Sequence, residues 1–137
     1  MATAIRPEIS EKNKYWIDRH RYYELKHFCL QYPYWKEVYS TDVAPRGSSF
    51  EMMTSTNIPS NPTARHAELK AQYSERMEMI EEAAKRADEE LYKYILKAIT
   101  EGLSYTHMKT RMDIPCGKDM YYDRYRRFFW ILDQIRE

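Results

Sequence analysis

Hydrophobic side chains recur along this sequence mainly at intervals of three, four and seven residues, the spacing of one face of an α-helix. The first such stretch covers residues 10–32 and opens with Ser10, a residue type that caps helix starts well. It predicts an amphipathic helix of about five turns, which ends before Pro33 because proline disfavours helical geometry in the residue before it. The predicted buried stripe consists of Trp16, Tyr23, His27 and Leu30.

Pro33 suits the first turn of a second, short helix, in which Trp35 and Tyr39 are the expected anchors. Residues 41–63 then lack any sustained period and are rich in Pro, Ser, Thr and Asn, which predicts a linker or mobile loop. This linker separates an N-terminal helical segment, residues 1–40, from a helical domain, residues 64–137. Its few apolar side chains either dock on the protein or a partner, or the whole stretch is disordered, and the sequence leaves both open.

Helical spacing resumes directly after the linker. One apolar stripe is formed by Leu69, Tyr73, Met77, Ile80 and Ala84. Asp88 is placed to cap a further helix that ends at Gly102, with Leu91, Tyr92, Ile95 and Ile99 facing inward. Between Ala87 and Asp88 the chain either bends or continues as one long helix, and the pattern allows both.

The C-terminal third predicts a short helix over residues 103–111, a turn over residues 112–116 plugged by Ile114, and a long helix from Gly117. The apolar face of the long helix is expected to carry Tyr121, Tyr125, Phe128, Leu132 and Ile135, with Phe129 beside them. The predicted fold is therefore all-α: a small helical bundle that ends in a helix-turn-helix, with a long irregular loop between its N-terminal and C-terminal helices.

The charge balance changes the expectation about partners. The chain has 137 residues and a formal net charge of +1, so it lacks the overall basic character of many proteins that bind nucleic acid or anionic membranes. Any binding of a polyanion must therefore use local positive charge. No apolar run approaches the roughly 20 residues that cross a bilayer, and we expect a cytoplasmic protein that does not contact a membrane.

No residue pattern favours catalysis, a cofactor or a metal. The sequence holds no glycine-rich phosphate loop and no zinc-protease or nucleophile-elbow motif. Cys29 and Cys116 form no metal-binding pair, and His20 and His27 near Cys29 lack a carboxylate cluster. Cys116 lies near a helix start, which favours its thiolate, but we interpret it as a small turn residue. We therefore expect no enzyme activity, no cofactor and no metal.

A short helix, a tight apolar turn and a helix with a polar, basic start form the arrangement that places a helix in the major groove of DNA. The groove is about 12 Å wide and admits one helix, whose amide-rich start favours anionic neighbours. Three arginines fall within four positions of the last helix, Arg124, Arg126 and Arg127. They form a dense positive patch, although Asp119 and Asp123 weaken it.

The stretch EGLSYTHMKTRMDIPCGKDMYYDRYRRFFWIL resembles the C-terminal end of ArpU/RinA-type transcriptional regulators of phages and prophages. The resemblance rests on Ile114-Pro115, Gly117-Lys118, Tyr121-Tyr122 and the Arg126–Phe129 run, and the first helical stretch is similar to the start of phage proteins with this tail. It implies a regulator in a bacterial host cell that reads promoter DNA. The residues carried over are Lys118, Asp119 and Tyr122 for bases, and Arg124, Arg126 and Arg127 for phosphates.

A second hypothesis is a small phage-encoded inhibitor that binds a host complex, such as a nuclease of the CRISPR type or RNA polymerase. Tyrosine, tryptophan, methionine and arginine are enriched at binding hot spots. Its expected anchors are Tyr22, Tyr32, Tyr34, Trp35 and Tyr39. Under either hypothesis the protein is a monomer or a homodimer, and its partners are double-stranded DNA or a host protein.

Overall fold

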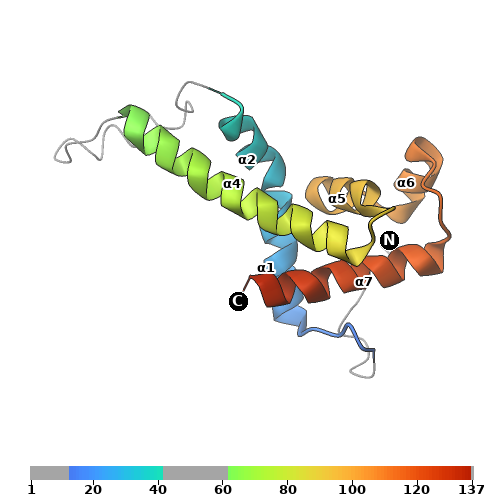
Figure 1. Ribbon diagram of the computed structural model, residues 1–137. Coiled ribbons are helices and arrows are strands. Elements are labelled where there is room, and N and C mark those ends of the chain that lie inside the picture. Colours follow the sequence, from blue (N-terminus) through green and yellow to red (C-terminus); the bar gives the residue numbers. More distant parts are fainter. Residues whose placement is uncertain (1–12, 42–61, 137) are drawn as a thin grey trace.

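The computed structural model describes residues 13–41 and 62–136, and within these ranges the chain forms helices and no strand. The predicted all-α class is thereby confirmed. Figure 1 shows α4 and α7 packed along each other, with α1 running across both and α5 and α6 at one end. The helices are α1 (Arg19–Leu30), α2 (Tyr32–Tyr39), α4 (Pro62–Ala87), α5 (Tyr92–Glu101), α6 (Tyr105–Met112) and α7 (Lys118–Ile135).

Helix α1 begins later than its hydrophobic pattern predicts. Residues 13–18 are not helical, and Asp18 caps the helix by accepting a hydrogen bond from the His20 amide at 2.9 Å. The side chain of Asn13 accepts one from the Tyr15 amide at 2.8 Å, a local turn that competes with helix formation. The prediction of a continuous helix over these residues is therefore wrong, while Ser10 lies outside the described residues.

The buried face of α1 also differs from the predicted stripe. Tyr22, Leu25, Phe28 and Cys29 are buried, whereas Tyr23 and Leu30 are 40% and 38% exposed and His27 is exposed. Bulky side chains surround this helix, so spacing alone gives no unique face. Packing on α7 decides the matter, because the Tyr22 ring meets Phe129 edge-on with ring centroids 5.1 Å apart.

Helix α2 has Pro33 in its first turn, as predicted, and packs along α4. Trp35 is 1% exposed and stacks on Tyr73 at 6.0 Å between ring centroids. The other predicted anchor, Tyr39, is 45% exposed, and Val38 is buried in its place. Of the predicted linker, only Thr41 and the first residues of α4 belong to the described part of the chain.

The chain bends between α4 and α5, which decides between the two alternatives that the pattern allowed. One carboxylate oxygen of Asp88, Oδ1, accepts hydrogen bonds from the amides of Glu90 and Leu91 at 2.8 and 2.9 Å. Ile95 is fully buried, as predicted. Gly102 ends α5 with φ +70°, a conformation that glycine adopts without the penalty of a Cβ.

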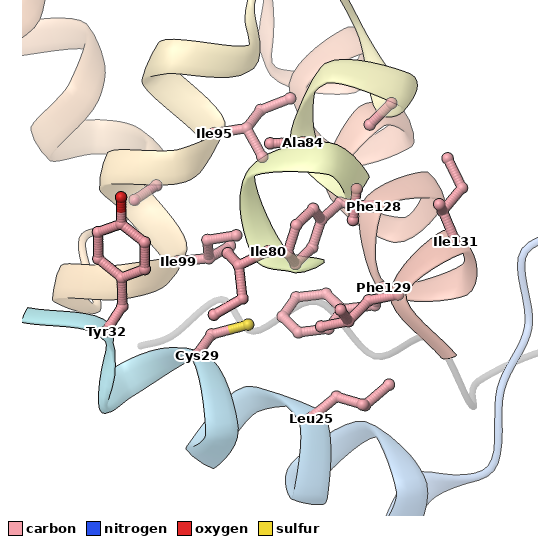
Figure 2. Close-up of a cluster of buried hydrophobic side chains, with 14 of the residues drawn as sticks. Leu25, Cys29, Tyr32, Ile80, Ala84, Ile95, Ile99, Phe128, Phe129 and Ile131 are labelled. Atoms are coloured by element: carbon pink, nitrogen blue, oxygen red, sulfur yellow. The ribbon is translucent and has the colours of Figure 1, made fainter. Parts of the chain in front are cut away.

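All these helices contribute to one core. Figure 2 shows Cys29 of α1, Ile80 of α4 and Ile99 of α5 gathered around the rings of Phe128 and Phe129 from α7. The predicted inner positions Met77, Ile80 and Ala84 are buried, as are Tyr121, Phe128 and Leu132. The N-terminal segment and the later helices therefore share a core, and the second half of α7 is its central element.

Candidate nucleic-acid interface

Helix α6 and its ends are fixed by local chemistry. Ser104 caps the helix, since its hydroxyl accepts a hydrogen bond from the His107 amide at 3.1 Å. Met108 is fully buried and holds the inner face. At the other end Asp113 has φ 52°, a left-handed conformation that aspartate tolerates better than most residues. The chain therefore leaves α6 sharply, as the predicted turn requires.

Four contacts fix the turn that joins α6 to α7. Ile114 is fully buried, as predicted for its plug, and its amide donates to the Met108 carbonyl at 3.2 Å. The Cys116 amide donates to the Ile114 carbonyl at 2.9 Å. The Tyr105 hydroxyl donates to the Cys116 carbonyl at 2.9 Å, and Lys109 donates to the Ile114 carbonyl at 3.4 Å. The start of α7 thus has a defined position relative to α6.

The first turn of helix α7 is exposed to solvent. Gly117 is its N-cap residue and provides no side-chain hydrogen bond to the first turn, and a Cβ placed there would meet nothing within 4 Å. Lys118 and Asp119 are exposed. The first amides of a helix carry partial positive charge and bind anions well when no side chain occupies them. This end of the molecule therefore has the geometry of an anion-binding helix start.

Five of the six predicted site residues of α7, together with Asp123, fall into two rows with a spacing of four, and Arg124 lies outside both rows. One row carries Lys118, Tyr122 and Arg126, and the other carries Asp119, Asp123 and Arg127. Tyr122 is half-buried between the rings of Tyr105 and Tyr121, with the Lys118 ammonium 5.9 Å from its ring centroid. Residues within one row are neighbours, whereas Lys118 and Arg127 are about two and a half turns apart and lie on opposite sides of α7.

Arg126 and Arg127 are both half-buried. The described part of the chain contains no ion pair for either side chain, and the Nε of Arg126 is buried without a hydrogen-bond partner there. Their charges are therefore not neutralised by the carboxylates of the described residues.

The sequence pattern did not single out Tyr15, which packs on Trp130 of α7 with ring centroids 5.6 Å apart.

Arg124 forms ion pairs with two carboxylates of the protein itself. Its Nε donates to Asp88 at 2.8 Å and its Nη1 donates to Asp123. The pKa of Arg124 is raised, first by the hydrogen bond to Asp88, which outweighs the opposing effect of burial. The sequence gives no sign of this pair, because Asp88 lies 36 residues away and its visible role is a helix cap. We therefore assign Arg124 to the internal structure rather than to phosphate contacts.

The aromatic anchors of the second hypothesis are largely internal. Tyr22, Tyr32 and Trp35 are buried, whereas Tyr34 and Tyr39 are 51% and 45% exposed. Tyr32 also donates its hydroxyl proton to Glu81. Three of the five expected anchors therefore stabilise the core, and only two are accessible to a partner.

The two thiols do not have the character of nucleophiles. Burial raises the pKa of Cys29 far above its ordinary value, and it also raises the pKa of Cys116. The expected preference of Cys116 for its thiolate is therefore wrong, since desolvation outweighs the nearby positive charge of Lys109. In the part of the chain that the structure describes, no three metal-ligating side chains come together, and no helix has the length and apolar character to span a bilayer.

An open groove of about 430 Å³ lies between α4 and the end of α7. Its lining includes Glu75, Glu78 and Glu82, together with Met79 and Ile135. This groove carries mainly negative charge and lies at the opposite end of α7 from Lys118, so it is not part of the surface at the start of α7.

Comparisons with protein-family models, with curated proteins and with solved structures find no match for this chain.

Proposed function

We propose that this protein binds double-stranded DNA through the start of α7 and acts as a phage or prophage transcription regulator. The single observation that carries the proposal is the exposed start of α7, which has no side-chain cap and follows a firmly anchored turn. A helix start of this kind fits the major groove and binds a phosphate with its amides. The resemblance of the C-terminal stretch to ArpU/RinA-type regulators supports the same conclusion.

The side chains of the two rows differ in their tasks according to their charge and their distance from the helix start. Arg126 and Arg127 contact phosphates, which position the protein without reading sequence. Lys118 at the helix start contacts base edges together with Asp119 and Tyr122. Asp119, one turn or less from the helix start, accepts a hydrogen bond from a cytosine amino group, and Tyr122 lies beside it. The carboxylates of Asp119 and Asp123 also repel the backbone, so we expect modest affinity and a strong dependence on sequence.

Fluorescence anisotropy with duplexes tiled across the DNA that flanks the coding sequence tests the proposal. The wild type should bind at least one duplex, and its affinity should fall steeply with salt, with a slope of about 0.9 in log–log terms for each phosphate contact. The variant Arg126→Glu/Arg127→Glu should lose this binding. A matched control with the same charge change, Lys36→Glu/Lys70→Glu on α2 and α4, lies away from α6 (Figure 1) and should bind normally.

Absence of binding to every duplex at low salt would overturn the proposal, as would equal loss in the control variant. The inhibitor hypothesis would then lead. It requires a stoichiometric complex with a host nuclease or RNA polymerase, and this complex should be lost in Tyr34→Ala/Tyr39→Ala, because these two tyrosines are the accessible anchors.

A further inference from the structure

The carboxylate of Asp88, at the corner between α4 and α5, forms an ion pair with Arg124 of α7. Oδ1 of Asp88 accepts hydrogen bonds from the amides of Glu90 and Leu91. Oδ2 accepts a hydrogen bond from the Arg124 guanidinium at 2.8 Å. The side chains of Asp88 and Arg124 are only 12% and 28% exposed. A pair so shielded from water is stronger than an ordinary surface ion pair and holds both groups in one geometry.

This contact lies where α7 has little other support from the body of the protein. Beyond Phe128 the helix is held by several buried side chains, but among residues 118–124 only Tyr121 is buried. The turn ties these residues to α6, which is itself a helix of eight residues with one buried side chain, Met108. The Asp88–Arg124 pair is the ion pair that joins this part of α7 to the α4–α5 corner within the described residues.

We infer that the Asp88–Arg124 ion pair orients the start of α7 and that both residues are positioning residues for DNA binding. This inference rests on the proposed function for its effect on DNA, and on the structure alone for its effect on the helix. A surface that is ordered before binding loses less freedom when the complex forms, so the pair increases affinity without contacting DNA. Arg124 thus acts through α7 instead of binding a phosphate.

The variant Asp88→Asn removes the pair selectively. The side-chain oxygen of asparagine still accepts hydrogen bonds from the Glu90 and Leu91 amides. Its NH₂ group takes the place of Oδ2, and because this group only donates, it cannot accept the hydrogen bond from the Arg124 guanidinium. Arg124→Gln removes the pair from the other side, and the double variant closes a thermodynamic cycle. For hydrogen exchange Asp123→Asn is the matched control, since it removes the other carboxylate that contacts Arg124 without touching the corner.

Hydrogen exchange tests the structural part of the inference without DNA. The amides of residues 121–124, which donate hydrogen bonds within α7, should exchange several-fold faster in Asp88→Asn and in Arg124→Gln, and no faster in the double variant than in either single one. The buried stretch of α1 around Leu25 and Cys29 should be unchanged, which shows that the protein remains folded. Unchanged exchange at residues 121–124 would overturn the inference even if DNA binding is found.

The direction of the change in DNA affinity of Asp88→Asn distinguishes a positioning role of Arg124 from a direct phosphate contact. Asp88→Asn should weaken binding about five- to tenfold on a duplex that the wild type binds, with an unchanged salt slope, because no phosphate contact is lost. If Arg124 instead contacts phosphate, releasing it from Asp88 leaves affinity equal or higher, and Arg124→Gln reduces the slope by about 0.9. That result would overturn the inference. A wild type that binds no duplex, with exchange altered as expected, would refute the proposed function and leave the orienting pair established.

Discussion

Leu25 and Leu30 stand five positions apart on α1 and have opposite environments. Leu25 is fully buried against the core, while Leu30 is 38% exposed beside Gly102. The difference arises because α1 turns its Tyr22 side toward α7, which carries Leu25 inward with it. Substitutions of these two leucines therefore test which face of α1 is buried.

Leu25→Ala should lower the free energy of unfolding by about 2–5 kcal/mol, because it removes buried methyl groups and leaves a cavity. Leu30→Ala is the matched substitution on the exposed side and should cost less than about 1 kcal/mol. Urea unfolding followed by circular dichroism measures both values. Equal costs, or a larger cost for Leu30, would place the predicted stripe of Tyr23, His27 and Leu30 inside after all.

At the scale of one element, α7 combines two demands along its length. Its second half supplies Phe128, Phe129 and Leu132 to the core, whereas its first turn is exposed and has no side-chain cap. A missing cap costs helix stability, and proteins usually provide one. An exposed start without a cap leaves amides available, which fits the proposed contact with a phosphate.

Gly117→Asp separates stability from function at this helix start. The carboxylate would cap α7 and interact favourably with its positive end, so the variant should be stabilised by about 0.5–1 kcal/mol. It would also place a negative charge where a phosphate is proposed to bind, and DNA affinity should fall at least tenfold. Thermal unfolding and anisotropy on the same samples measure the two effects. A capped variant that binds DNA as well as wild type would show that the α7 amides do not contact phosphate.

At the scale of the whole molecule, the Asp88–Arg124 pair connects two parts of the chain that differ in their packing. Burial alone would raise the pKa of Asp88, but the hydrogen bonds from Arg124 and from the Leu91 and Glu90 amides outweigh it and lower that pKa. A lowered pKa in the folded state means that the ionised carboxylate stabilises the fold. This stabilisation is complete above the ordinary aspartate pKa of about 3.9.

Acid should therefore remove this contribution selectively. The difference in unfolding free energy between wild type and Asp88→Asn should be constant from about pH 5 to 7 and shrink as the pH falls through the lowered pKa of Asp88. Taking the difference cancels the titration of carboxylates that both proteins share. A difference that grows as the pH falls would contradict the assigned direction of the pKa.

The sequence by itself determined the helical class, the order of the elements and the turn around Ile114. It also determined most inner positions of α4 and α5, although Leu69 is only partly buried. Local signals carry these features: helical spacing, caps such as Ser104 and a glycine at the end of α5. It also placed Tyr122 next to Lys118 and Arg126, because residues four apart on a helix are neighbours.

Tertiary structure alone decided the start and face of α1, the exposure of Tyr39 and the partner of Arg124. On α1, bulky side chains occur all around the helix, so only contact with α7 selects the buried ones. Asp88 and Arg124 meet across 36 positions of sequence, a distance over which no local pattern carries information. Local spacing therefore indicates which residues are candidates for the proposed DNA contact, and packing decides which of them already have a partner within the protein.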